Sequence, residues 1–247
     1  MSNKTESNVY TILFAVAMVV VVGGLLAFTA SALRPKIDNN QRLEKQQNIL
    51  YAMGVNDNDE TSAVFVSTDK APELFNQYIT KQLVIEGDKV TEDENAYLID
   101  VKKEQASAKA GKERRLPLFV GNKDGQTYYI APIRGKGLWD AIWGYVAMDK
   151  DMVVQGVYFD HKGETAGLGA NIKQRYFMDD FIGEHLLSEN GDFAGITVAK
   201  GNNDPKNENK TDNKVDAIAG ATITGDGVTA MLKSELKKYV PYFKTLK

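Results

Sequence analysis

The segment Asp216–Thr224 (DAIAGATIT) decides how the second half of the chain is interpreted. Val215–Ile218 has the apolar character of a short strand, and Ala219–Ala221 is small enough for a tight turn. A final amphipathic helix follows, with one apolar face made of Val228, Met231, Leu232, Leu236 and Tyr239. Free N–H groups and the helix dipole at such a turn favour a bound phosphate group. The alternative is that Thr224 or Asp226 simply caps the helix.

Upstream of this turn, three segments rich in β-branched and aromatic residues are expected to form strands. They are Thr127–Ile133, Trp143–Met148 and Met152–Phe159. A glycine-bearing loop, His161–Asn171 (HKGETAGLGAN), comes directly after the third strand. The spacing of its glycines does not match the Gly-x-Gly-x-x-Gly fingerprint of dinucleotide sites, and no other segment after a strand does.

The remaining segments complete a mixed architecture. Lys173–Leu187 is expected to be a helix, because apolar residues recur at helical intervals: Tyr176, Phe177, Phe181, Ile182 and Leu186. Phe193–Ala199 is expected to be a strand, and Gly201–Lys214 a polar loop of disordered appearance. Glu104–Arg115 is basic and is expected to be a solvated surface loop or helix. Sheet and helices in separate runs predict an α+β domain.

The N-terminal part of the chain is apolar. Val9–Leu33 contains no charged residue, and a helix of this length would measure roughly 37 Å, enough to cross a bilayer core of about 30 Å. Ala30-Ser31-Ala32 resembles a signal-peptide cleavage site, but signal cores have only about 7–15 apolar residues. We therefore expect an uncleaved transmembrane helix over residues 9–33. A connecting helix over 34–54 should follow, with Gly54 ending it, and a globular domain over 55–247.

Charges near the apolar segment bear on its orientation. Arg34, Lys36, Arg42 and Lys45 follow it, whereas Lys4 and the terminal amine precede it. The positive-inside rule would then place the globular domain in the cytoplasm, although long domains can be translocated despite such charges.

Composition excludes several classes of function. The chain has 247 residues and a net charge of −3, so it offers no basic surface for nucleic acid. It has no cysteine, which rules out disulfides, thiolate zinc sites and cysteine-ligated iron–sulfur clusters within the chain. With only His161 and His185, a histidine-rich metal site is not predicted, and both are expected at the surface. Any redox chemistry must therefore use an organic cofactor.

The Asp216–Thr224 segment resembles a known attachment motif, Asp-x-x-(Ser/Thr)-Gly-Ala-Thr. It occurs in membrane-bound flavoprotein subunits of the sodium-translocating NADH:quinone oxidoreductase and of the related Rnf complex. In those proteins, a flavin transferase joins the FMN phosphate to the last threonine. The resemblance assigns Asp216 to the acidic position, Gly220 and Ala221 to the turn, and Thr222 to the attachment point. Ala219 departs from the usual Ser/Thr, and Thr224 is the alternative acceptor.

Two further motifs carry the same resemblance. Glu164–Gly169 (ETAGLG) is similar to the family's Glu-Thr-Pro-Gly-Leu-Gly loop, with Ala166 in place of proline. Pro132–Tyr145 (PIRGKGLWDAIWGY) is close to the pattern that distinguishes the C subunit of the sodium pump from its Rnf counterpart. Residues 56–126 are poorly constrained by the resemblance.

The resemblance implies an α+β FMN-binding domain on a single N-terminal transmembrane helix. Backbone N–H groups of Gly167 and Gly169 would reach the flavin, and Leu168 would pack on its ring. Glu164 and Thr165 would hydrogen-bond the flavin or orient this loop. Each of these glycines also suits an ordinary turn.

Three side chains outside these two loops complete the expected flavin site. Leu138 and Trp139 are candidates for covering the flavin, although a core or membrane-facing tryptophan is an equal alternative. Lys200 would place positive charge near the flavin N1–C2 carbonyl and stabilise an anionic reduced form, or it is simply a solvated lysine at a strand end. No catalytic residue and no metal ligand is predicted.

The implied function is electron relay. FMN bound covalently through phosphate to Thr222 would pass electrons between other redox centres of a complex that oxidises NADH, reduces ubiquinone and expels sodium. The other membrane subunits of that complex would be partners, as would a flavin transferase during maturation. The family places the domain on the periplasmic side of the bacterial inner membrane, against the charge bias. Two alternatives remain: the Rnf-type G subunit, which couples ferredoxin to NAD, and a tethered flavin-binding or sensor domain without relay function.

Overall fold

A computed structural model describes residues 7–59 and 61–246. The chain divides after Arg42 into two compact units, the second of which is Leu43–Lys247. Lys4, Glu60 and Lys247, which enter the orientation and domain predictions above, lie outside the described residues.

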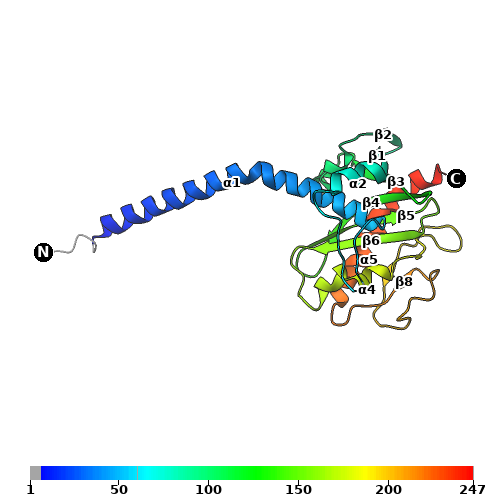
Figure 1. Ribbon diagram of the computed structural model, residues 1–247. Helices are drawn as coiled ribbons and strands as arrows, with labels where there is room; N and C mark the ends of the chain where they lie inside the picture. Colours follow the sequence, from blue (N-terminus) through cyan, green and yellow to red (C-terminus); the bar gives the residue numbers. More distant parts are fainter. Residues whose placement is uncertain (1–6, 60, 247) are drawn as a thin grey trace. The chain divides into compact units, whose positions relative to one another are not determined.

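One long helix, α1 (Asn8–Ala52), contains both the apolar segment and the expected connecting helix (Figure 1). It is the one helix among the described residues that is long and apolar enough to cross a membrane. Its end has the hydrogen bonds of a Schellman motif, with Val55 N donating to Leu50 O and Gly54 N to Tyr51 O, both at 2.9 Å. The predicted helix end at Gly54 is confirmed. The domain boundaries at residues 33 and 54 remain predictions.

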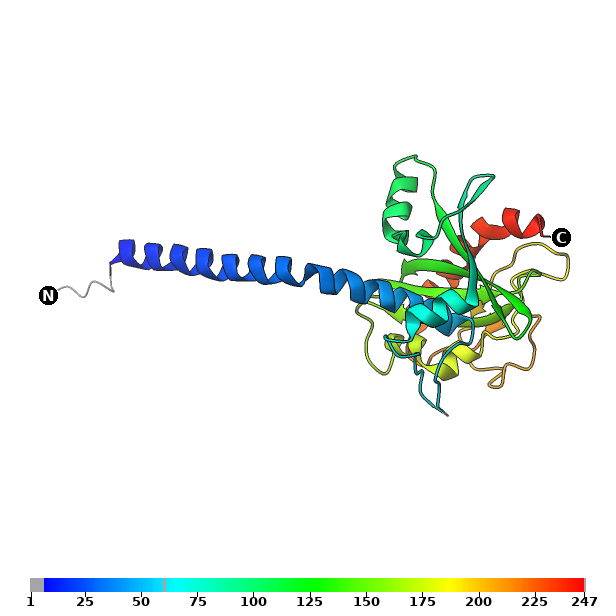
Figure 2. The same cartoon turned by 45° about the horizontal axis from the view of Figure 1, so that its top comes forward.

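The second unit is built on a six-stranded antiparallel sheet with strand order β2-β1-β3-β4-β5-β6 (Figures 1 and 2). Its strands are β1 (Ile79–Glu86), β2 (Lys89–Glu92), β3 (Leu116–Lys123), β4 (Gln126–Lys136), β5 (Ala141–Met148) and β6 (Val154–His161). The three strands predicted from the sequence are confirmed as β4, β5 and β6, with small shifts of their ends. The third begins at Val154 because Met152 lies in the preceding turn with φ of 60°.

Helices and short strands surround this sheet. They are α2 (Ala71–Tyr78), η2 (Ala96–Leu98), α3 (Val101–Lys109), η3 (Gly169–Lys173), α4 (Arg175–Asp179), α5 (Thr222–Leu236), η4 (Lys237–Tyr239) and α6 (Val240–Lys244). A small parallel pair joins β7 (Thr197–Val198) to β8 (Lys214–Val215). The α+β prediction is confirmed. The predicted final helix corresponds to α5, except that it ends at Leu236, so Tyr239 lies in η4 and α6 follows.

The core lies between the sheet and its helices. The last turns of α1 contribute Ile49 and Leu50, neither of which is exposed. Phe159 of β6 packs against Phe177 and Phe181, with ring centroids 6.2 and 5.2 Å away. Burying one such side chain contributes about 1.5–3 kcal/mol to stability. The core therefore holds the sheet in place, and α5 lies against that sheet.

The prediction of a helix over Lys173–Leu187 is wrong. Only η3 and α4 are helical there, and the chain after Asp179 bonds to the start of β6 instead. Gly183 N donates to Val154 O at 2.7 Å, and Val154 N donates to Glu184 O at 2.9 Å. Leu186 N donates to Met152 O at 3.1 Å. These tertiary hydrogen bonds, together with burial of Phe177 and Phe181, override the helical spacing of the apolar residues.

The two strands predicted in the C-terminal third are much shorter than expected. Phe193–Ala199 forms a strand only at β7, because the N–H groups of Ala194 and Gly195 both turn to Leu186 O at 2.9 Å. Likewise, the strand predicted over Val215–Ile218 is reduced to β8, which begins one residue earlier, at Lys214, and ends at Val215.

Two segments expected to be loose are partly buried. In the polar loop 201–214, Asn207 is buried and its amide donates to Asp180 O and to Glu184 Oε1. In the basic stretch 104–115, Glu104 is buried and pairs with Arg115 at 2.6 Å. A charged stretch can therefore contain a residue that anchors it to the domain.

Candidate functional site

A cavity of about 250 Å³ opens at the start of α5. It brings together segments far apart in the sequence: the β4–β5 hairpin, the loop after β6, and the turn before α5. Most of the predicted site residues line it, namely Leu138, Glu164, Thr165, Leu168, Gly169, Gly220, Ala221, Thr222 and Thr224, together with Ile223.

Two threonines stand at this helix start in different surroundings. Thr222, the first residue of α5, is exposed, and its hydroxyl has no hydrogen-bond partner among the described residues. Thr224 is 1% exposed, and its hydroxyl donates to Glu164 Oε2 at 2.6 Å. The hydroxyl of Thr222 is therefore available to a reagent, whereas that of Thr224 is engaged.

The first turn of α5 is open to an anion. Ala221 occupies the N-cap position, and no side chain caps the helix, so the expectation that Thr224 or Asp226 does so is wrong. The reason is that the Thr224 hydroxyl points to Glu164 instead. Uncapped N–H groups and the positive end of the helix dipole make this turn suitable for a phosphate. Gly220 precedes it with φ of 70°, a conformation that favours glycine.

Glu164 is the polar centre of the site. It is 7% exposed, and its Oε1 accepts from Trp139 N at 3.0 Å while its Oε2 accepts from Thr224. Burial alone would raise the pKa of its carboxyl, but these hydrogen bonds outweigh it and lower the pKa. The ionised carboxylate therefore holds the hairpin and the helix start together.

The backbone comes very close to this carboxylate. A Cβ atom added to Gly137 would lie 2.5 Å from Glu164 Oε1, and one added to Gly169 would lie 2.6 Å from Glu164 Oε2. Such distances are far below van der Waals contact. Alanine at either position would have to displace the Glu164–Thr224 pair.

Trp139 lies beside the cavity without lining it. Its indole Nε1 donates to Thr165 Oγ1 at 3.1 Å, and the side chain is 66% exposed. Together with the exposed side chains of Leu138, Leu168 and Ile223, it forms an apolar rim at the cavity mouth. A planar aromatic ligand attached at the helix start would meet this rim.

Three other predicted residues do not line the cavity. Asp216 Oδ1 instead accepts from the backbone N–H groups of Asn203 and Asp204, at 3.2 and 3.4 Å. Lys200 is exposed and lies two residues after the end of β7. Gly167 accepts from Asn171 Nδ2 at 3.2 Å through its carbonyl.

Sequence reasoning missed one residue of the site and misplaced both histidines. Ile223 lines the cavity with an exposed side chain, and nothing in the local sequence sets it apart from an ordinary helix residue. His161 was expected at the surface, but it is half-buried and its Nδ1 accepts from Glu164 N at 3.2 Å. His185, also expected at the surface, is half-buried as well, because it bridges to Val153. Among the described residues, no group of three His, Asp or Glu side chains is placed to hold a metal ion.

Comparison with known proteins connects this geometry to a cofactor. The family model described as an FMN-binding domain matches residues 137–237. The C subunit of the Na(+)-translocating NADH-quinone reductase from Pseudomonas aeruginosa is 31% identical, over 96% of this chain and 94% of its own length. The corresponding protein from Vibrio vulnificus is 30% identical, over 91% and 89%.

Solved structures agree with these relatives. The C subunit from Parabacteroides distasonis superposes with a TM-score of 0.71 at 33% identity, covering 85% of this chain and 96% of that one. NqrC of Shewanella oneidensis superposes with a TM-score of 0.63 at 26% identity, covering 83% and 99%.

Proposed function

Because the chain belongs to the family of C subunits of Na(+)-translocating NADH-quinone reductases, we propose that it carries FMN covalently on Thr222 and relays electrons within that complex. The linkage is a phosphoester between the FMN phosphate and the Thr222 hydroxyl. The family relationship itself gives an FMN-binding domain and a place in a multi-subunit reductase.

The observation that carries the proposal is the difference between the two threonines. Thr222 is exposed at an uncapped helix N-terminus, and its hydroxyl has no partner among residues 7–59 and 61–246. Thr224 is buried, and its hydroxyl is bound to Glu164. A phosphate on Thr222 would face free backbone N–H groups, whereas one on Thr224 would break a buried hydrogen bond and meet a carboxylate.

The other residues of the cavity fit the rest of the group. Leu138, Leu168 and Ile223 offer exposed apolar surface to a flavin ring, and Trp139 stands beside them. Glu164 and Gly169 set the shape of the site, as described above. When bound, FMN supplies the capacity to accept and release electrons. No residue of this chain is proposed as a catalytic acid or base, so its role is to hold the flavin firmly between redox partners.

Two further parts of the proposal concern the surroundings of the chain. The apolar part of α1 would anchor it in the bacterial inner membrane, with the globular domain on the periplasmic side. Its partners would be the other membrane subunits and, during maturation, a flavin transferase. The Pseudomonas, Vibrio and Parabacteroides relatives named above are all C subunits of the Na(+)-translocating reductase, which favours this assignment over the Rnf-type G subunit.

Intact-mass measurement tests the attachment directly. The chain is produced together with a flavin transferase and denatured, and its mass is compared with that of Thr222→Ala, Thr222→Ser and Thr224→Val. We expect one added FMN in the wild type, in Thr222→Ser, which keeps a hydroxyl, and in Thr224→Val. Thr222→Ala should be colourless after denaturation.

Two results would contradict attachment at Thr222. Full covalent flavin in Thr222→Ala, or its loss in Thr224→Val alone, would move the attachment to Thr224. A wild-type chain that never retains flavin after denaturation would favour a tethered binding or sensor domain, because a covalently held relay must keep its cofactor.

A further inference from the structure

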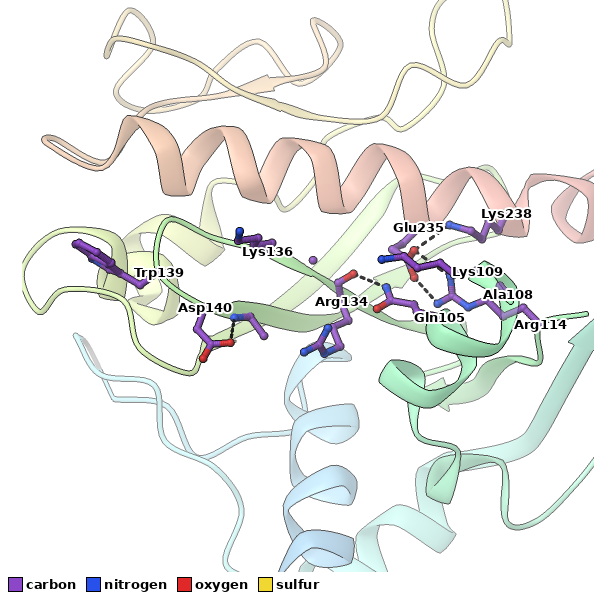
Figure 3. A pocket seen from close by; sticks show the side chains of 12 residues that line it. Gln105, Ala108, Lys109, Arg114, Arg134, Lys136, Trp139, Asp140, Glu235 and Lys238 are labelled. Carbon is purple, nitrogen blue, oxygen red and sulfur yellow. Dashed lines mark hydrogen bonds and ion pairs between the residues drawn. The ribbon is translucent and has the colours of Figure 1, made fainter. Parts of the chain in front are cut away.

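A second cavity, of about 700 Å³, shares the β4–β5 hairpin with the first (Figure 3). Leu138 lines the smaller cavity, whereas the next two residues, Trp139 and Asp140, line the larger one. The other walls come from α3, the end of β4 and the junction of α5 with η4. Gln105 Nε2 donates to Arg134 O at 2.7 Å and so joins α3 to β4. The cavity is thus formed by packed elements of a single compact unit.

Positive charge dominates the lining. Five cationic side chains contribute, namely Lys109, Arg114, Arg134, Lys136 and Lys238, against only two acidic ones, Asp140 and Glu235. Both acids are already paired. Glu235 accepts from Arg114 at 3.0 and 2.5 Å and from Lys238 at 2.8 Å. Asp140 pairs with Lys162 at 2.8 Å.

Three of the cations remain without a direct ion pair. The side chains of Lys109, Arg134 and Lys136 have no hydrogen bond or ion pair with any of the described residues. Figure 3 shows them distributed along the cavity, on α3 and on the end of β4. Like charges gathered in one cavity repel one another, and an anion placed among them would relieve that repulsion.

The paired residues form a fixed wall. The side chains of Arg114 and Glu235 are only 11% and 6% exposed, so their ion pair is largely removed from water. Arg114 Nε is buried and has no hydrogen-bond partner among the described atoms. A ligand in the cavity would therefore meet the three cations without an ion pair rather than this buried pair.

The size and chemistry of the cavity identify the class of ligand. A volume of about 700 Å³ lies within the range of roughly 300–1,000 Å³ found for small-molecule sites. Arginine binds phosphate oxygens in a bidentate manner, and lysine contributes a mobile point charge; together they are the usual phosphate ligands. We propose that this cavity binds a small molecule that carries a phosphate group, held by Arg134, Lys136 and Lys109.

Calorimetric titration of the full chain in neutral detergent tests this site with sodium pyrophosphate as the probe. Sodium chloride keeps the ionic strength constant, because unspecific attraction depends on salt. We expect saturable binding of one pyrophosphate per chain. The double variant Arg134→Gln/Lys136→Gln should weaken it at least tenfold, and the single variant Lys109→Gln should weaken it measurably.

The matched control removes the same charge elsewhere. Lys81 and Lys89 are exposed on β1 and β2 and do not line the cavity. The variant Lys81→Gln/Lys89→Gln should change the affinity less than twofold. An equal loss in both double variants would show diffuse attraction and overturn the proposal, as would the absence of saturable binding. The Lys109→Gln result stands if the Arg134 variant fails to fold.

Two more probes define the phosphate and its source. Citrate carries similar charge on carboxylates, and tighter binding of citrate than of pyrophosphate would contradict a phosphate site. Dihexanoyl phosphatidic acid presents the phosphate as a lipid headgroup. If either phosphate probe binds in a manner that depends on Arg134 and Lys136, the site is supported, and the tighter of the two shows whether the phosphate is soluble or lipid-borne.

Discussion

The hydrogen bond between Thr224 and Glu164 should be a major stabilising contact of the domain. It joins two buried groups at 2.6 Å, and one of them is an ionised carboxylate. Hydrogen bonds to charged groups contribute about 1.5–3 kcal/mol. We therefore expect Thr224→Val, which keeps the side-chain shape, to destabilise the fold by about that amount. Glu164→Gln, which also weakens the bond to Trp139 N, should cost at least as much.

A double-mutant cycle isolates this contact. The double variant should lose less stability than the sum of the single variants, with a coupling of about 1–2 kcal/mol, because the second change removes a bond that is already broken. In a domain of this size, 1 kcal/mol shifts the thermal midpoint by about 2–4 °C. Circular dichroism of the flavin-free chain in neutral detergent would measure these shifts.

Thr222→Val is the matched control. It removes a hydroxyl from the same helical turn, but one that is exposed and has no partner among the described residues. It should cost less than about 0.5 kcal/mol. If it costs as much as Thr224→Val, or if the cycle is additive, Glu164 does not hold the helix start as described.

The pH dependence gives this prediction a second readout. The folded chain lowers the pKa of Glu164 below its ordinary value of 4.5, so the folded state binds fewer protons there than the unfolded state does. The contribution is present above pH 4.5 and is lost as the pH falls further. Glu164→Gln should flatten this acid limb of the stability curve, and an unchanged limb would assign it to other carboxylates.

Three further predictions concern other parts of the chain. Burial raises the pKa of the fully buried Glu184 to about 7, despite the hydrogen bond from Asn207. The folded state therefore binds this proton more tightly than the unfolded state does. The resulting stabilisation is present below pH 4.5 and is lost as the pH rises through 7. Glu184→Gln should therefore remove up to about 3 kcal/mol of pH dependence between pH 4.5 and 8 in thermal unfolding curves; an undiminished slope would point to other groups. Lys200→Met should lower the flavin reduction potential only slightly and leave the thermal midpoint unchanged, since the side chain is exposed and screened; a redox titration with no shift at all would make Lys200 an ordinary surface lysine. A reporter active only in the periplasm should be active when fused after Lys247, and activity of a cytoplasmic reporter instead would reverse the proposed topology.

Local patterns predicted the central strands better than the segments around them. β4, β5 and β6 follow one another through short hairpins, so apolar and aromatic runs with turns between them were sufficient to locate them. Phe177 and Phe181 show the opposite case. Their helical spacing is real, but both are buried against Phe159, and the chain after them exchanges hydrogen bonds with β6. Such long-range bonds leave no local signal.

The candidate site shows the same division. The turn before α5 and the glycine-bearing loop were identified as site segments by their resemblance to family motifs, since their small residues alone suit an ordinary turn or helix start, and both line one cavity. Asp216 belongs to the same stretch of sequence as the turn, yet its side chain lies elsewhere, because it binds the backbone of Asn203 and Asp204. Lys200, which comes from a separate segment, does not line the cavity either. The basic cavity was not predictable, since Lys109, Arg134 and Lys238 come from elements whose packing the sequence pattern does not specify.

The hairpin between β4 and β5 is a common wall of the two cavities, and this has a thermodynamic consequence. Leu138 lines one cavity, Trp139 and Asp140 line the other, and Glu164 fixes the loop through Trp139 N. A ligand in one cavity that shifts this loop changes the free energy with which the other cavity binds its own ligand. By thermodynamic linkage, the second ligand changes the binding free energy of the first by the same amount. We therefore expect occupancy of the basic cavity and occupancy of the helix start to be reciprocally linked. The affinity of the basic cavity for an anion, compared between the wild type and Thr222→Ala, would measure the strength of that linkage.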